Sequence, residues 1–221
     1  MATKDHQSEP IESASETLQR IFDGHGSVLG SQMADESSRY DVLKKTDFPK
    51  PQRTRRIAVA NQKGGVGKTT STVNTAAALA NKGAQVLVID MDPQGNASTA
   101  LGVSHASGEP SVYDVIEGRS DLGDVITVCP DFPTLDVVPA SIDLSGAELE
   151  VADLPNRNTL LKEALDLYLR QSDKHYDYVF IDCPPSLGLL VINAMCAVTE
   201  MLIPIQAEYY ACLLYTSDAA D

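Results

Sequence analysis

Residues 55–70 of the chain spell RRIAVANQKGGVGKTT, and this stretch decides the fold. Its first part, residues 55–61, has the apolar, β-branched character of a short strand. After the glycines, residues 69–82 place apolar side chains on one side, as an amphipathic helix does. A strand, a glycine loop and a helix in this order predict a phosphate-binding loop. In such a loop, backbone N–H groups and the helix N-terminus hold an anion.

Two side chains of this loop have the chemistry that a nucleoside triphosphate requires. Lys68 would place an ammonium on the β- and γ-phosphates, and the Thr69 hydroxyl would ligate Mg²⁺. The alternative is a chance glycine turn before a helix, but Gly-Lys-Thr in this register and with these flanks favours the phosphate site. The residues expected to bind the nucleotide are Lys63, Gly64, Gly65, Val66, Gly67, Lys68, Thr69 and Thr70.

A second polar segment, Asp90-Met91-Asp92-Pro93-Gln94-Gly95-Asn96, follows the next expected strand. Carboxylates at the carboxyl end of a parallel strand lie where open α/β sheets bind ligands. Asp92 is therefore a candidate catalytic residue that would orient or polarise the attacking water. The alternative for Asp92 is a turn or helix N-cap aspartate. Asp90 is expected to support the site from behind.

A third segment, residues 176–182, is an apolar strand that ends in Asp182 and is followed by Cys183-Pro184-Pro185-Ser186. A strand-end aspartate is weak evidence by itself, but beside an upstream phosphate loop it predicts a Mg²⁺ site. We therefore expect Asp182 to hold the metal, directly or through water. Cys183 is expected to be structural, since a reactive thiol needs an exposed, electropositive setting.

These three segments together resemble the ParA/Soj family within the ParA/MinD superfamily, and the resemblance covers roughly residues 55–211. An early lysine such as Lys63 resembles the deviant Walker A loop, the segment around Asp92 resembles switch I, and Asp-Cys-Pro-Pro-Ser resembles switch II. By this resemblance, Lys63 is a catalytic residue that reaches the nucleotide of the partner subunit in an ATP-bound sandwich dimer, and Asp92 is the hydrolysis residue. Without the family, Lys63 would be a solvated loop lysine near phosphate.

The resemblance also implies a function. It predicts an ATPase that uses ATP and Mg²⁺, forms a homodimer on ATP and binds DNA non-specifically through a region beyond residue 211. Hydrolysis stimulated by a ParB/Spo0J-like centromere-binding protein would then release it, so that chromosome or plasmid origins segregate. Its expected location is the cytoplasm, associated with the nucleoid.

The expected fold is a doubly wound, mostly parallel α/β P-loop domain. We predict three regions: a disordered extension with a basic linker at 1–54, a truncated ATPase domain at 55–211, and an unrelated ending at 212–221. A short helix is possible at 11–22. Further strands are expected at 85–90, 125–128, 135–139, 176–182 and 201–206, the last of them inside the sheet, and helices at 98–102, 111–118, 142–152, 158–170 and 189–198.

Composition limits the function classes. The chain has 221 residues, of which 43% are hydrophobic, and a net charge of −14, which argues against a large basic surface on these residues. Its four cysteines show no CxxC spacing, so we expect reduced thiols rather than a metal or disulfide framework. No apolar run of about 18 residues or signal-peptide pattern occurs, so no membrane span is expected.

The last ten residues change in character from the rest of the chain. Back-translated, residues 212–221 fit a transposase sequencing adaptor read in frame, whereas the family would continue with a helix and further strands. We therefore expect an adaptor-derived ending on a truncated gene; the alternative is a natural, divergent tail. The acidic charge of the remaining residues is then no argument against DNA binding by a longer protein.

Three other functions are compatible with parts of the pattern. A MinD-like membrane-cycling ATPase shares the loop, but its switch I lacks Pro-Gln-Gly and it uses a C-terminal amphipathic helix. An iron–sulfur carrier would need bridging cysteines, and the four here are scattered. A non-catalytic, nucleotide-gated DNA-binding scaffold would not need the complete set of Lys68, Thr69, Asp92 and Asp182.

Overall fold

The computed structural model describes residues 28–46 and 48–206. The chain divides into two units, residues 1–49 and 50–221, and each is taken by itself. In the described ranges, none of the helices is long and apolar enough to span a membrane. The predicted helix at 11–22 and the ending at 212–221 lie outside these ranges.

The described part of the first unit is a helix, α2 (Val28–Lys45), within the extension for which the sequence predicts mostly disorder. Its large apolar side chains, including Tyr40, Val42 and Leu43, are exposed. The helix has no single apolar face, so its sequence lacks the periodic signal by which a helix is recognised. Lys44 and Lys45 in the last turn suit the negative end of the helix dipole.

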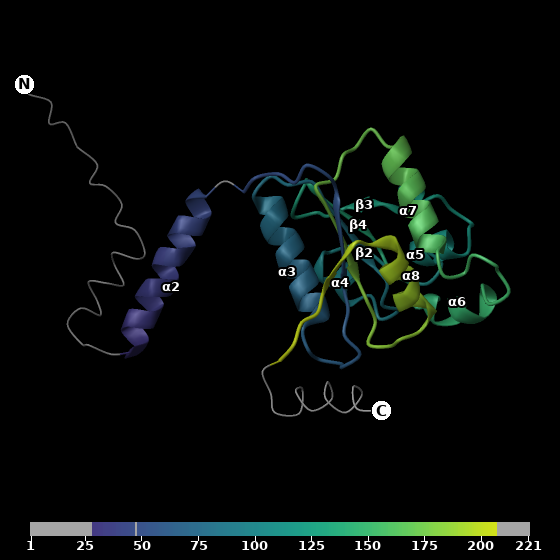
Figure 1. Ribbon diagram of the computed structural model, residues 1–221, viewed down its shortest axis with the longest axis horizontal. Helices are drawn as coiled ribbons and strands as arrows, with labels where there is room; N and C mark the ends of the chain where they lie inside the picture. Colours follow the sequence, from purple (N-terminus) through teal and green to yellow (C-terminus); the bar gives the residue numbers. More distant parts are fainter. Residues whose placement is uncertain (1–27, 47, 207–221) are drawn as a thin grey trace, which may run out of the picture. The chain divides into compact units, whose positions relative to one another are not determined.

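The second unit is built on one six-stranded sheet with the order β3-β4-β2-β5-β1-β6. Its strands β2, β3 and β4 are labelled in Figure 1. Its strands are β1 (Arg55–Val59), β2 (Val86–Asp90), β3 (Thr127–Val128), β4 (Leu135–Val138), β5 (Tyr178–Asp182) and β6 (Glu200–Leu202). Every neighbouring pair is parallel except β3 with β4. This confirms the predicted mostly parallel sheet.

Helices cover both faces of the sheet. They are α3 (Lys68–Asn81), α4 (Asn96–Ala100), α5 (Val112–Ile116), α6 (Leu144–Glu150), α7 (Leu160–Gln171), α8 (Leu189–Ala197) and a 3₁₀ turn, η1 (Leu122–Val125). In Figure 1, α3 lies on one side of the strands and α7 and α8 on the other. Since both faces are covered, β2 is buried along its whole length, as expected of a parallel strand.

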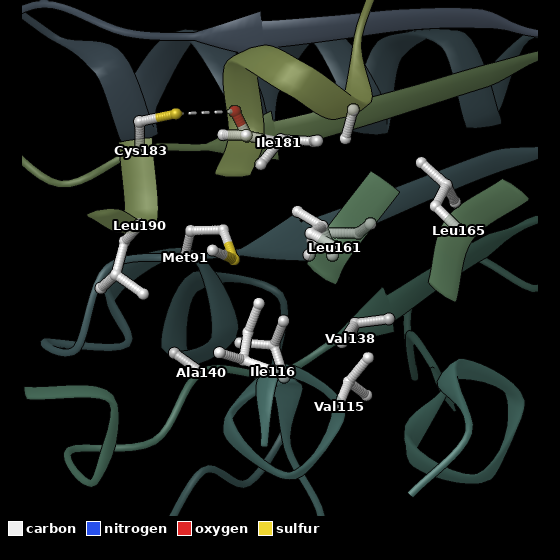
Figure 2. Close-up of a cluster of buried hydrophobic side chains, with 14 of the residues drawn as sticks. Met91, Val115, Ile116, Val138, Ala140, Leu161, Leu165, Ile181, Cys183 and Leu190 are labelled. Atoms are coloured by element: carbon white, nitrogen blue, oxygen red, sulfur yellow. Dashed lines mark hydrogen bonds between the residues drawn. The ribbon is translucent and has the colours of Figure 1, made fainter. Parts of the chain in front are cut away.

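Two apolar clusters fill the space between helices and sheet. The side chains of β2 alternate between them: Leu87 and Ile89 join the cluster under α5 to α8, whereas Val86 and Val88 join the cluster under α3. Figure 2 shows part of the first cluster, in which Met91 from the end of β2 lies among residues of the helices. This packing fixes the ends of β2 and β5, where the predicted site residues begin.

Within the second unit, the structure differs from the predicted elements in two places. The segment predicted as a strand at 125–128 begins in a 3₁₀ turn and adds only the short antiparallel β3 to the sheet. The strand predicted at 201–206 ends at Leu202, and within the described residues β6 is an edge strand rather than an inner one. Its side chains Met201 and Leu202 are exposed, and Pro204 lacks the N–H that would extend the ladder.

Candidate functional site

The loop between β1 and α3 has the backbone that its glycines predict. Gly65 and Gly67 have φ of 73° and 91°, in the left-handed region that side chains rarely adopt. Gly67 is the N-cap of α3, and the Ser71 N–H donates to the Gly67 carbonyl oxygen at 2.8 Å. The first N–H groups of a helix have no intrahelical acceptor, so this N-terminus can receive an anion.

The two lysines of the loop are brought together. Lys68 is 7% exposed, and its ammonium donates to the carbonyl oxygen of Lys63 at 3.2 Å. The Lys63 N–H donates to the side-chain oxygen of Asn61 at 3.0 Å, and Val66 is buried. Both lysines and the glycines between them therefore belong to one compact turn, as the spacing predicts.

Asp182 is linked to the first turns of α3 by two threonines. The Thr69 hydroxyl donates to Asp182 Oδ2 at 2.7 Å. Thr72 Oγ1 lies 3.0 Å from Asp182 Oδ1 and 3.0 Å from the Lys68 carbonyl oxygen, so its single hydrogen is shared between them. The structure thus joins the two residues predicted to hold Mg²⁺, while their role as metal ligands stays a prediction.

Asp90 lies behind the site, as its sequence position suggested. It is fully buried and accepts hydrogen bonds from the Ser98 N–H at 2.8 Å, the Ser98 hydroxyl at 2.7 Å and the Asp92 N–H at 3.1 Å. Burial raises the pKa of Asp90, and the bonds from Ser98 oppose that rise. Asp90 therefore fixes the start of the turn that carries Asp92.

Asp92 sits at the head of a tight turn and is 8% exposed. Its Oδ1 accepts from the Gln94 N–H at 3.0 Å, and its carbonyl oxygen accepts from the Gly95 N–H at 2.9 Å. The turn-aspartate alternative thus describes what Asp92 does in this structure, whereas the N-cap of α4 is Gly95. The second carboxylate oxygen, Oδ2, leaves capacity to accept from a water molecule, and the hydrolytic role stays a prediction.

Three carboxylates share the carboxyl ends of β2 and β5. Asp90 and Asp182 are register partners on these neighbouring strands, and Asp92 follows two residues later. Burial, together with the charges of Asp90 and Asp92, raises the pKa of Asp182 to about 6, although the hydrogen bond from Thr69 lowers it. This accumulated negative charge favours the binding of a cation.

Cys183 follows Asp182 and is structural, as expected. Burial, together with the charge of Asp182, raises the pKa of its thiol to about 12. Figure 2 shows the thiol directed at the carbonyl oxygen of Ile181, 3.8 Å away. A buried thiol with a raised pKa is a poor nucleophile.

The oxygen ligands at this site suit Mg²⁺ better than they suit a metal whose ligands all come from protein side chains. The described residues contain no cluster of three or more His, Cys, Asp or Glu side chains able to cage a metal. Mg²⁺ is usually held by one or two protein oxygens, with water and phosphate oxygens completing its shell. The Thr69 hydroxyl and the Asp182 carboxylate provide this set.

Sequence reasoning missed two residues, Asn61 and Gln206, whose side chains link the phosphate loop to residues 204–206. Asn61 donates through its side-chain amide to the Pro204 carbonyl oxygen at 2.9 Å, and Gln206 donates to the Gly65 carbonyl oxygen at 3.0 Å. These bonds join residues 143 and 141 positions apart, which local patterns cannot reveal. The only hint in the sequence was that Asn61, a polar residue, lies between the expected strand and the loop.

Comparisons with known proteins agree with this geometry. A family model described as an AAA domain matches residues 54–213. The sporulation initiation inhibitor protein Soj of Bacillus subtilis is 50% identical over 155 residues, 70% of this chain and 59% of that protein. The chromosome partitioning protein ParA of Caulobacter vibrioides is 46% identical over 155 residues, 70% of this chain and 57% of its own length. The chain thus spans less than two thirds of the length of these relatives.

Solved structures agree as well. A cobyrinic acid a,c-diamide synthase of Mycobacterium smegmatis with a bound ATP analogue and magnesium is 36% identical, with a TM-score of 0.63 over 75% of this chain and 66% of that one. MinD of Pyrococcus horikoshii complexed with Mg-ADP is 31% identical, with a TM-score of 0.60 over 75% of this chain and 63% of that one. Together with the loop, the Thr69–Asp182 pair and the turn at Asp92, the family match shows that the chain belongs to the AAA domain family, and among curated proteins it is similar to Soj and ParA.

Proposed function

We propose that this chain is the nucleotide-binding part of a DNA-partitioning ATPase that uses ATP and Mg²⁺. The observation that carries the proposal is the bond from Thr69 to Asp182 beside the buried ammonium of Lys68. A hydroxyl, a carboxylate and a lysine thus lie around one loop, and these are the groups that phosphoryl transfer uses. The two structural neighbours, which bind an ATP analogue or ADP with magnesium, support the same assignment.

Each residue has a distinct task in this proposal. The loop amides and Lys68 bind the β- and γ-phosphates, and Thr69 and Asp182 hold Mg²⁺. The bound metal would neutralise charge that develops on the phosphate oxygens. Asp92, held at the head of its turn, orients the attacking water. Asp90 and Ser98 keep that turn in place.

We further propose that ATP brings two copies together face to face. Lys63 then reaches the nucleotide of the other subunit, as the family resemblance implies. Its position in the phosphate loop, where its carbonyl oxygen accepts from the Lys68 ammonium, supports a role close to the phosphates. The dimer binds DNA non-specifically, and a ParB/Spo0J-like partner stimulates hydrolysis and release. The name of one relative, chromosome partitioning protein ParA, supports a role in partitioning, and the cycle and a nucleoid-associated location follow from the family resemblance.

The proposal is tested by measuring nucleotide binding and turnover of the purified chain. We expect Mg²⁺-dependent ATP binding, and we expect Lys68→Ala to weaken it by about 100-fold or more, since it removes the phosphate-binding ammonium. Lys45→Ala, at an exposed lysine of α2, is the matched control and should bind as the parent does. A well-folded parent that binds no nucleotide, or equal binding by the parent and Lys68→Ala, would contradict the proposal.

A further inference from the structure

The imidazole of His105 covers the turn that carries Asp92. Gly95, the last residue of that turn, is buried and has a φ of 62°. A Cβ built on Gly95 would lie 2.4 Å from His105 Nδ1, 2.6 Å from Cε1 and 2.9 Å from Cγ. The ring therefore packs directly on the Gly95 backbone, and a side chain at Gly95 would displace it.

A hydrogen bond fixes the other side of the ring. His105 Nε2 lies 2.8 Å from the hydroxyl of Thr99, near the end of α4. The chain reaches this place because α4 ends in a reversal at Gly102, with a φ of 70°. The Val103 N–H donates to the Ser98 carbonyl oxygen at 3.0 Å, so the chain folds back along α4.

The residues on both sides of His105 in the sequence have their own contacts, which hold its loop in place. Glu109 accepts from the Ser104 hydroxyl at 2.5 Å and from the Ala106 N–H at 3.2 Å. The Ser107 hydroxyl donates to Asp143, before α6, at 3.0 Å. His105 is thus held in a loop with its own contacts and does not depend on the nucleotide loop for its position.

The contact on Gly95 reaches Asp92 through the backbone. The Gly95 N–H donates to the Asp92 carbonyl oxygen, and the Gln94 N–H donates to its carboxylate. The Thr99 N–H donates in turn to the Gly95 carbonyl oxygen at 2.9 Å. A ring that holds Gly95 and Thr99 therefore restricts the rotation of the turn that would move the Asp92 carboxylate.

We propose that His105 is a positioning residue for hydrolysis: its ring clamps the turn from Asp92 to Gly95 onto α4 and so holds the Asp92 carboxylate toward the nucleotide. The inference rests on the proposed ATPase function for its catalytic consequence. It adds to that function a residue outside the three motifs. His105 acts through Gly95 and does not touch the nucleotide.

The first test is hydrogen exchange on the nucleotide-free chain. In His105→Ala we expect the amides of residues 94–99 to exchange several-fold faster than in the parent, because the turn loses its cover. His175→Ala, at an exposed histidine between α7 and β5, is the matched control and should exchange as the parent does. Unchanged exchange in His105→Ala would overturn the proposal.

The second test separates kcat from KM. We expect His105→Ala to lower kcat by about 10- to 100-fold with KM for ATP nearly unchanged, since displacement of a catalytic group costs this much while the phosphate loop is untouched. His105→Phe keeps a ring over Gly95 but loses the bond to Thr99, so it should recover part of the loss. A raised KM with unchanged kcat, or equal losses in both variants, would overturn the proposal. If the parent hydrolyses no ATP, the proposed function fails, and hydrogen exchange still decides whether His105 orders the turn.

Discussion

Thr69 donates its hydroxyl hydrogen to Asp182 across 2.7 Å, which ties the first turn of α3 to the end of β5. The two residues lie 113 positions apart in the sequence. In this arrangement the carboxylate is buried beside Asp90, on the neighbouring strand, and accepts from the hydroxyls of Thr69 and Thr72. The buried negative charge of Asp182 therefore destabilises the nucleotide-free protein, and this effect can be measured.

Replacing Asp182 with asparagine should stabilise the nucleotide-free protein at neutral pH. The folded pKa of Asp182, about 6, exceeds its ordinary value of 3.8, so the folded state binds the proton more tightly. Its contribution to stability is thus fully present below about pH 4 and is lost as the pH rises through 6. We expect Asp182→Asn to raise the free energy of unfolding by about 1–3 kcal/mol at pH 7.5, as measured by urea unfolding.

The same Asp182→Asn variant should lose Mg²⁺-dependent nucleotide binding, because the amide is a poor ligand for the metal. Asp131→Asn, at an exposed aspartate, is the control and should change neither property. If Asp182→Asn were less stable than the parent at pH 7.5, the predicted increase in the free energy of unfolding would be contradicted.

Replacing Asp92 with alanine should slow hydrolysis without removing nucleotide binding. The loop amides and Lys68 are untouched, whereas the carboxylate that would orient water is lost. We expect kcat to fall by about 100-fold, with ATP-dependent dimers retained. Single-turnover hydrolysis and calorimetric binding check this, with Asp131→Ala as control. Equal hydrolysis by Asp92→Ala and the parent would remove Asp92 from the mechanism.

Replacing Lys63 with alanine should separate dimer formation from nucleotide binding. Lys63 contributes its carbonyl oxygen to the bond with Lys68, and alanine keeps that oxygen. We expect monomers that bind ATP but form no dimer, as measured by light scattering with a non-hydrolysable analogue. Gln62→Ala, at the exposed residue just before it, should dimerise normally. Unchanged dimer formation by Lys63→Ala would exclude its action on the partner subunit.

Replacing Leu165 with alanine should test the core under α7. Leu165 is fully buried in the cluster that includes Leu161 and Ile181 (Figure 2), so the variant loses packing and leaves a cavity. We expect the free energy of unfolding to fall by about 2–5 kcal/mol. Leu149→Ala, whose parent side chain is 84% exposed, should change it by less than about 0.5 kcal/mol. Equal effects of the two substitutions would contradict the described packing.

The sequence predicts the sheet and most of the site because both depend on local pattern. Buried parallel strands are continuous apolar runs, and polar residues directly after them must meet at one edge of the sheet. Asp90, Asp92 and Asp182 follow this rule, and the glycines of the loop have the φ values that the motif requires.

Other contacts could not be predicted in this way. The bond from Asn61 to Pro204 and the packing of His105 on Gly95 depend on how separate loops meet, and no spacing encodes them. The position of β6 at the edge of the described sheet depends on strand order, which its apolar sequence does not reveal. The helix α2 lacks an apolar face, so its side chains carry no periodic signal.

The place of β1 in the sheet has a consequence for how the protein folds. It is the first strand of the described residues, yet its two neighbours there are β5 and β6, and its Arg55 pairs with Glu200, 145 positions later. A ribosome therefore releases β1 long before either partner exists, so we expect slow closure of the sheet and a need for chaperones meanwhile. Asn61 and Gly65 form their hydrogen bonds with Pro204 and Gln206, which are synthesised much later. The nucleotide loop is therefore encoded early in the chain but completed late.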